Sequence, residues 1–283
     1  MHATSTPLFR PVTRIVRGMP ASDGAGVRML RVIGQPQLPN LDPFLMLDAF
    51  GSDRADDYIA GFPDHPHRGF ETVTYMLAGR MRHRDSQGNS GDLGPGSVQW
   101  MTAGRGIVHS EMPLQESGRM AGFQLWVNLP ARDKMCAPRY QDIPADRVPV
   151  VAGSGLVVKV LAGRYAAADG PVSTVATDPG YLDATLEAGA RFDHAIAPGH
   201  TAFAYVFEGE VGFGDAATPV RATHLAVLGP GERVGAVGGP DGGRFILVSG
   251  RPLGEPIVQY GPFVMNTAAE IRQAIDDFQA GRF

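Results

Sequence analysis

Short apolar runs, separated by glycine, proline and aspartate, follow one another along this chain from residue 14 to about residue 264. Examples are residues 73–77, 123–127, 156–161 and 245–248. Runs of this length are typical of strands, whereas a membrane span needs roughly 18 consecutive apolar residues. With 37 glycines and 23 prolines among 283 residues, breaks recur too often for a helical bundle. The sequence therefore predicts an all-β protein, built as a sandwich or as antiparallel β-barrels.

The last segment changes to a helical period. Thr267 and Glu270 form a capping box, in which each side chain can satisfy the backbone amide of the other residue. An apolar stripe at helical spacing follows, made of Ile271, Ala274, Ile275 and Phe278. We expect a C-terminal helix over residues 268–280 that packs on the body of the protein.

A weak internal repeat divides the chain. Residues 75–79 match residues 205–209 at an offset of 130, and the Gly-Pro-Gly turn at 94–96 matches the one at 229–231 at an offset of 135. The segment between the two halves is rich in proline and charge, as a connection would be. We place the boundary at residue 140, which predicts one domain over residues 1–140 and a second over residues 141–283.

Two short triplets carry metal-ligand side chains. His65 and His67 flank Pro66, and His109 stands two residues before Glu111. Residues two apart in a strand point to the same face, so each triplet projects two ligands in one direction. Pro66 favours an edge strand or a strand end. Two antiparallel strands of a barrel would bring three imidazoles and one carboxylate to one cavity.

A set of three imidazoles and a carboxylate suits Fe(II), Mn, Ni, Cu or Zn. The set has no thiolate, so it does not resemble a closed structural zinc site. It leaves coordination positions open for a substrate oxygen, dioxygen or water, as catalytic metal sites do.

The two strings that hold these triplets, residues 65–75 and residues 99–113, resemble the signature of the pirin family within the cupin superfamily. Residues 123–130 and the closing residues 273–283 are also similar to it. The resemblance implies a bicupin, that is, two cupin-type antiparallel β-barrels with a C-terminal helix. It also implies one metal in the N-terminal barrel, with a ligand set that falls on His65, His67, His109 and Glu111.

At the strand position where most cupins carry a glutamate ligand, this chain has Thr72. The resemblance to pirins implies that Glu111 supplies the carboxylate ligand instead. We interpret the neighbouring Glu71 as structural, because it faces the opposite side of its strand.

The repeat offsets map the four ligand positions onto the second half of the chain. The predicted counterparts are Ala195, Ala197, Arg244 and Ile246. We therefore expect the domain over residues 141–283 to carry no metal ligands and to act as a scaffold.

Other polar residues carry weaker predictions. Arg68 fits a structural ion pair or the steering of an anionic substrate. Gln124 fits the pocket or a sheet hydrogen bond, and Trp126 points the same way. His83 lies among arginines, which favours a solvated face. Cys136 has basic neighbours that could lower a thiol pKa, but no partner for redox sensing.

The resemblance implies a dioxygenase similar to the pirin-type quercetin 2,3-dioxygenases, which acts on a flavonol-like aromatic substrate and dioxygen. Glu111 would accept the proton of the flavonol 3-hydroxyl, and ring opening would release carbon monoxide and a depside. Fe(II) is the expected ion, with Ni, Cu, Mn and Zn as alternatives. The alternative function is a non-catalytic, metal- and redox-dependent regulator that binds a transcription factor or a metabolic enzyme.

The net charge limits which partners the protein can attract, and the cysteine content indicates the redox compartment. The formal net charge is −4, which gives no general attraction to nucleic acid or to an anionic membrane. One cysteine cannot form an internal disulfide, which fits a reducing compartment. We expect a cytoplasmic protein that acts as a monomer.

Overall fold

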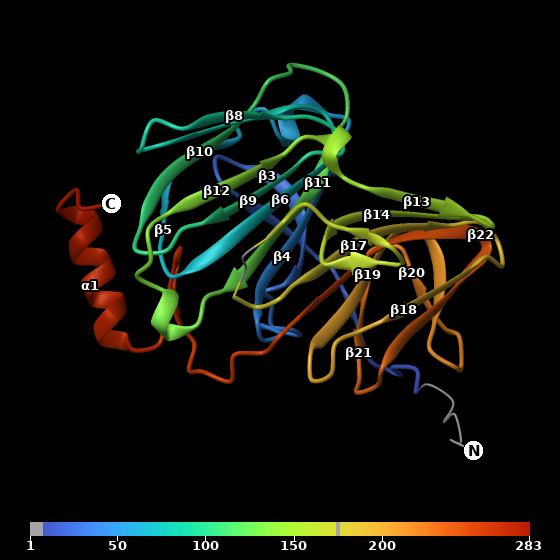
Figure 1. Cartoon of the computed structure of the whole chain (residues 1–283). Coiled ribbons are helices and arrows are strands. Elements are labelled where there is room, and N and C mark those ends of the chain that lie inside the picture. The colour runs from blue at the N-terminus through green and yellow to red at the C-terminus, as the bar shows by residue number, and fades with distance from the viewer. Residues whose placement is uncertain (1–7, 174–175) are drawn as a thin grey trace. The chain divides into compact units, whose positions relative to one another are not determined.

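The computed structural model describes residues 8–173 and 176–283, which group into two compact units (Figure 1). The larger unit comprises Met19–Arg147 and Leu253–Phe283, and the smaller unit comprises the described residues of Met1–Gly18 and Val148–Pro252. Each unit is therefore built from two separate chain segments. The division predicted at residue 140 falls within a strand of the larger unit, and residues 1–7 of the predicted first domain lie outside the described residues.

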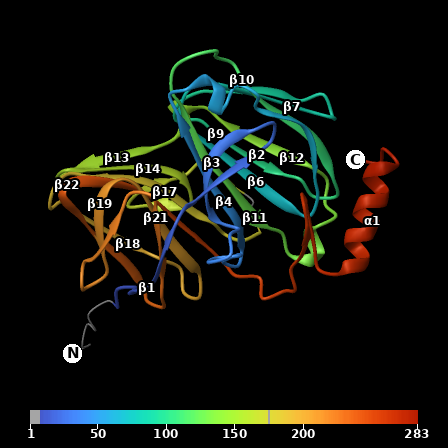
Figure 2. The same cartoon turned by 180° about the vertical axis from the view of Figure 1, so that it is seen from behind.

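Two antiparallel sheets form the larger unit. The seven-stranded sheet has the order β12-β9-β6-β11-β4-β3-β2, and the four-stranded sheet has the order β5-β10-β7-β8. Figure 2 shows β3 and β2 beside β4, at one edge of this sheet. The strands of the first sheet are β2 (Met19–Asp23), β3 (Val27–Ile33), β4 (Phe44–Ser52), β6 (Phe70–Ala78), β9 (Val98–Thr102), β11 (Met120–Asn128) and β12 (Arg139–Ile143). Those of the second are β5 (Phe62–His67), β7 (Met81–Asp85), β8 (Ser90–Leu93) and β10 (Ile107–Pro113).

Short elements complete the larger unit. They are the 3₁₀ turns η1 (Ala55–Asp57), η2 (Ala131–Asp133) and η3 (Ala145–Arg147), the hairpin of β23 (Val258–Tyr260) and β24 (Phe263–Met265), and the helix α1 (Ala268–Gln279). None of the described helices has the length and the apolar character that crossing a membrane requires.

The smaller unit is one nine-stranded sheet and a short ribbon. The sheet has the order β1-β21-β19-β22-β17-β14-β13, with β18 paired to β22 and β20 paired to β19. Its strands are β1 (Val12–Arg17), β13 (Val150–Gly153), β14 (Leu156–Ala162), β17 (Gly180–Leu186), β18 (Arg191–Ala195), β19 (Thr201–Phe213), β20 (Thr218–Arg221), β21 (His224–Leu228) and β22 (Arg233–Gly250), and the ribbon is β15 (Arg164–Tyr165) with β16 (Ala168–Asp169). The all-β class with one C-terminal helix is thus confirmed.

The helix α1 spans Ala268–Gln279, close to the predicted range. Thr267 accepts a hydrogen bond from the Glu270 amide at 3.2 Å, but the Glu270 side chain accepts from the Asn266 amide, one residue earlier than a capping box predicts. Ile271 and Ala274 pack on the β23-β24 hairpin through Phe263 and Met265, and Ile275 is partly buried against them. Phe278, the last residue of the predicted stripe, is exposed.

Two buried cations tie this C-terminal segment to the sheets of the larger unit. Arg68, which follows β5, donates to Asp277 of α1 at 2.7 Å. The ammonium of Lys134 donates to the carbonyls of Gly69 and Val264 and to the side chain of Asn128. Because each N–H of the ammonium has an acceptor, the charge is satisfied despite its burial.

Candidate metal centre

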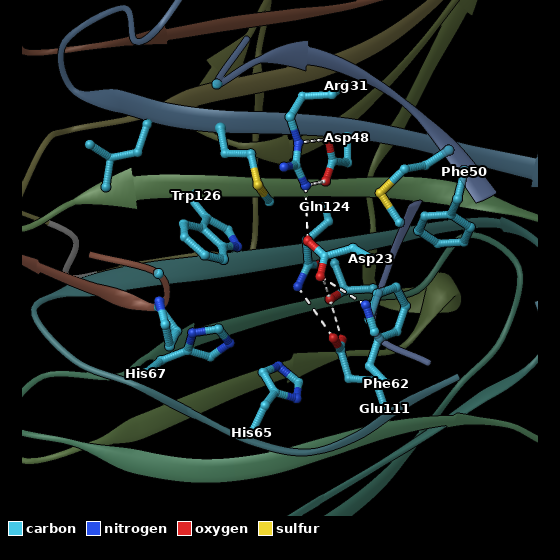
Figure 3. A pocket seen from close by; sticks show the side chains of 18 of the residues that line it. Asp23, Arg31, Asp48, Phe50, Phe62, His65, His67, Glu111, Gln124 and Trp126 are labelled. Carbon is cyan, nitrogen blue, oxygen red and sulfur yellow. Dashed lines mark hydrogen bonds and ion pairs between the residues drawn. The ribbon is translucent and has the colours of Figure 1, made fainter. Parts of the chain in front are cut away.

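The three histidines predicted from spacing meet at one point. His65 and His67 lie on β5, which is an edge strand as Pro66 predicted, and His109 pairs directly with His65 across to β10. The ligand nitrogens of all three residues lie within 4.8 Å of one another. Two nitrogens that share an ion at about 2.1 Å lie up to about 4.2 Å apart. The spacing of the three residues is therefore close to that of ligands that share one ion. Figure 3 shows two of them, His65 and His67, side by side in the pocket.

Several nitrogens of this cluster are left without a protein partner, as a metal site requires. Nε2 of His109 is buried and makes no hydrogen bond to any described residue. The ring of His67 is also buried, and one of its nitrogens faces the backbone carbonyl of Pro262, which leaves the lone pair of the other nitrogen unused. Nδ1 of His65 lies 2.8 Å from the Pro63 carbonyl, which can only accept, so Nδ1 carries the proton and Nε2 keeps its lone pair. These unused lone pairs fit a bound cation.

Burial also sets the charge of the cluster. It lowers the pKa of His67 and of His109 well below the usual range, and the neighbouring imidazoles lower both further. Neutral imidazole is the form that binds a metal. The environment thus favours metal binding over protonation.

Glu111 lies in the same cavity but outside the three-histidine group. Its Oε2 accepts from Nε2 of Gln124 at 3.3 Å. The Thr74 hydroxyl lies 2.8 Å from Glu111 Oε1 and 2.6 Å from Gln124 Oε1. The single hydroxyl proton of Thr74 can be donated to only one of these two oxygens. If Oε1 of Glu111 carried a proton, Glu111 could donate to Thr74 while Thr74 donates to Gln124, and both contacts would be hydrogen bonds.

His83 was predicted on a solvated face, and this prediction was wrong. The strand β7 alternates, so that Arg82 and Arg84 point outward while His83 is only 1% exposed. Its Nδ1 lies 3.2 Å from Nδ1 of His109, and its ring contacts Tyr140. The period-two pattern of residues 81–85 was the signal for this burial, but the neighbouring arginines outweighed it.

A cavity of about 770 Å³ opens from the histidines into the larger unit. Strands of both its sheets line the cavity, and His65, His67, Thr74, Glu111 and Gln124 belong to its wall. The rest of the wall is mainly apolar, with side chains that include Met29, Met46, Phe50, Phe62 and Trp126. The size and lining suit one flat aromatic molecule with a few polar groups.

A second polar group on this wall was missed by the sequence analysis. Arg31 on β3 pairs directly with Asp48 on β4, and Nε and Nη2 donate to its two carboxylate oxygens at 2.9 and 2.7 Å. Nη2 also donates to Asp23 at 2.9 Å. The signal was Asp48 itself, because a lone carboxylate inside an apolar run needs a buried partner.

The other weighed residues have structural contacts. Arg68 is absent from the cavity wall and pairs with Asp277, which supports the ion-pair alternative. Glu71 faces away from the cavity and accepts from Thr102 at 2.6 Å. Burial raises the pKa of the Cys136 thiol, so its basic neighbours do not activate it.

The smaller unit repeats the strand arrangement of the metal-centre sheet, and its register corrects the sequence offsets. The order β5-β10-β7-β8 corresponds to β18, the first half of β22, the second half of β19, and β20. An alignment of Gly79 with Gly209 makes Phe213 the counterpart of His83. His83 pairs across the sheet with Glu111, and Phe213 pairs with Ala236. Glu111 thus corresponds to Ala236, not to Ile246. The two Gly-Pro-Gly turns are not equivalent, because one precedes β9 and the other follows β21.

The remaining counterparts follow from the same pairing. His109 corresponds to Val234, and its partner His65 corresponds to His194. His67 then corresponds to Ile196. Val234, Ala236 and Ile196 are buried in an apolar cluster, so side chains of the core occupy the positions that correspond to His109, Glu111 and His67.

Comparison with known proteins covers nearly the whole chain. Residues 26–127 match a family model described as Pirin, and residues 181–283 match one described as Pirin C-terminal cupin domain. A pirin-like protein of Caulobacter vibrioides is 53% identical over 97% of this chain and 99% of its own length. A protein of Pseudomonas aeruginosa named "Putative quercetin 2,3-dioxygenase" is 50% identical over 96% of this chain and 98% of its own. The crystal structure of a quercetin 2,3-dioxygenase from Acinetobacter baumannii superimposes with a TM-score of 0.89 at 34% identity, covering 97% of this chain and 98% of that one.

Proposed function

This chain belongs to the pirin family, and we propose that it is a metal-dependent dioxygenase of flavonol-like aromatic substrates. The observation that carries the proposal is the meeting of His65, His67 and His109, with unused lone pairs, at one end of a largely apolar cavity. The names of the relatives from Pseudomonas aeruginosa and Acinetobacter baumannii support the same substrate class.

The three imidazoles would hold one divalent transition ion, with Glu111 as the fourth ligand. We expect Fe(II), and Ni, Cu, Mn and Zn have donor preferences that the same set can satisfy. When bound, the ion supplies Lewis acidity that stabilises an oxyanion, together with redox chemistry toward dioxygen. The larger unit is then the metal-binding cupin domain, and the smaller unit is a cupin scaffold.

Glu111 would also accept the proton of the substrate hydroxyl. The contacts of Thr74 with Glu111 and Gln124 leave one proton too few, so a proton received at Oε1 of Glu111 completes the network. Gln124 holds the carboxylate through its other oxygen, which keeps Oε1 oriented while the proton moves. A carboxylate in this position can change between ligation and hydrogen bonding as a substrate arrives.

The cavity supplies binding and exclusion of water. Its apolar walls would cover the two faces of an aromatic ring system, since Trp126, Phe62 and the methionines offer flat or adaptable surfaces. The reaction is balanced without a further reductant. Dioxygen adds to the flavonol, two carbon–carbon bonds of the heterocycle break, and the depside and carbon monoxide together contain all the atoms.

Metal content and flavonol turnover test the proposal together. The chelator-treated protein should bind one Fe(II) per chain under anaerobic conditions and then consume quercetin when oxygen is admitted. His109→Ala should lose the metal and the activity, whereas His224→Ala, on β21 of the smaller unit, should keep both. A His109→Ala protein that retains metal and activity would overturn the site assignment.

A further inference from the structure

The Arg31 guanidinium is a second polar element of the cavity, away from the histidines. Asp48 holds it from one side with a two-pronged pair, and Asp23, at the rim, binds Nη2. In Figure 3 Gln124 and Asp23 lie between Arg31 and Glu111. Gln35, Asp64 and Gln259 also belong to the wall, and the rest of it is mainly apolar.

One nitrogen of this guanidinium has no described partner. Nε and Nη2 are used by Asp48 and Asp23, while Nη1 makes no hydrogen bond within the described part of the chain. The side chain is about one quarter exposed and belongs to the cavity wall. Its two N–H groups are therefore donors that a bound molecule can reach.

A similar pair in the smaller unit shows what a purely structural arrangement looks like. Arg244 donates from Nε and Nη2 to the two carboxylate oxygens of Asp183 at 2.9 and 2.6 Å. The carboxylate of Asp183 is buried, as that of Asp48 is. There, however, Nη1 faces Glu208 at 3.6 Å and the guanidinium stacks over Phe207. Protein groups thus occupy the side of Arg244 that Arg31 leaves open.

We propose that Arg31, held by Asp48, is a specificity residue that donates from Nη1 to a hydroxyl on the pendant ring of the flavonol-like substrate, remote from the metal-binding hydroxyl. Asp23 accepts a hydrogen bond from that hydroxyl or from the hydroxyl next to it. A hydroxyl fits better than an anion, because one guanidinium beside two carboxylates leaves the group with a net negative charge, and a hydroxyl both donates and accepts. This assignment rests on the function proposed above and adds which part of the substrate is recognised.

Three flavonols that differ only on the pendant ring test the assignment by binding, without turnover. Galangin has no hydroxyl on that ring, kaempferol has one and quercetin has two. Their dissociation constants are measured with the Ni-loaded protein in the absence of oxygen, for the wild type, Arg31→Lys and the matched control Arg244→Lys. Lysine keeps the charge beside Asp48 but removes Nη1. Asp23→Asn, at the exposed rim, serves as a second variant if Arg31→Lys fails to fold.

We expect the wild type and Arg244→Lys to bind kaempferol and quercetin about tenfold more tightly than galangin. Arg31→Lys should bring the three constants to within about twofold while leaving galangin unchanged, and Asp23→Asn should reduce the preference in the same direction. Equal affinities in the wild type, or an equal loss for all three compounds in Arg31→Lys, would overturn the assignment and leave the dioxygenase proposal standing. Failure of every flavonol to bind would overturn both.

Discussion

The Nδ1 atoms of His83 and His109 lie 3.2 Å apart between two buried rings. One of these nitrogens must donate and the other must accept. A neutral His109 that binds a metal through Nε2 carries its proton on Nδ1, and so it is the donor. His83 is then the group that sets the tautomer and the ring orientation of a metal ligand.

Replacement of His83 should therefore weaken metal binding although His83 is not itself one of the proposed metal ligands. We expect His83→Leu to lower the affinity for Ni(II) about 10- to 100-fold, because the Nδ1 proton of His109 loses its acceptor. His83→Asn offers a carbonyl acceptor and should recover part of the loss. Competition with a coloured chelator measures the affinity. A His83→Leu protein with unchanged affinity would show that the contact is only packing.

Glu111→Gln should separate catalysis from metal retention. The amide keeps a similar shape and can still contact Thr74, but it cannot accept the substrate proton. We expect one metal ion per chain at saturating Fe(II), with a kcat for quercetin about 10²- to 10⁴-fold lower. Steady-state oxygen uptake and metal analysis of the same sample measure both quantities. Turnover near the wild-type rate would assign the proton to another acceptor.

Gly69 allows the close approach of the C-terminal segment. Its φ is +88°, and a Cβ there would overlap the carbonyl oxygen of Val264 in β24. Gly88 has nearly the same φ, +87°, but a Cβ there would meet nothing within 4 Å. Both Ala variants carry the backbone strain of about 1–2 kcal/mol, and only Gly69→Ala adds the clash.

We therefore expect Gly69→Ala to lower the free energy of unfolding by at least about 2 kcal/mol more than Gly88→Ala. Denaturant titration followed by tryptophan fluorescence reports on the correct unit, since Trp100 and Trp126 both belong to the larger one. Equal destabilisation by the two substitutions would contradict this prediction, because it would mean that β24 moves away from the new Cβ at residue 69 without loss of stability.

Lys134 predicts a dependence of stability on alkaline pH. Burial lowers its pKa from 10.5 to about 8. Between these values the unfolded chain binds more protons than the folded one, so stability rises with pH. Relative to Lys134→Met, the free energy of unfolding should gain up to about 3 kcal/mol from pH 8 to pH 10.5 and stay flat below pH 8. Urea titrations at fixed pH values measure this difference, and a decrease over that range would contradict the assignment.

The local pattern of the sequence was sufficient for much of the fold. The alternation and length of the apolar runs predicted strands, and the stripe of Ile271 and Ala274 predicted α1. The triplet spacing brought His65, His67 and His109 together, since a strand puts residues two apart on one face. The family resemblance and the bicupin fold are confirmed by the match of both cupin models.

What could not be predicted depends on contacts between distant parts of the chain. No local pattern indicates that β1 pairs with β21, or that Arg68 reaches Asp277 across more than two hundred residues. The Gly-Pro-Gly turns were matched by composition, but the register of β19 and β22 shows that they stand at different points of the repeat. His83 was missed because the charge of its neighbours was given more weight than the alternation of its strand.

Carbon monoxide release tests the central proposal most directly. Protein loaded anaerobically with Fe(II), and separately with Ni(II) or Cu(II), is mixed with quercetin and then with oxygen, and headspace carbon monoxide is measured beside flavonol loss. We predict one carbon monoxide for each quercetin consumed in at least one metal form, and none with His109→Ala. The absence of both flavonol loss and carbon monoxide in every metal form would contradict the account.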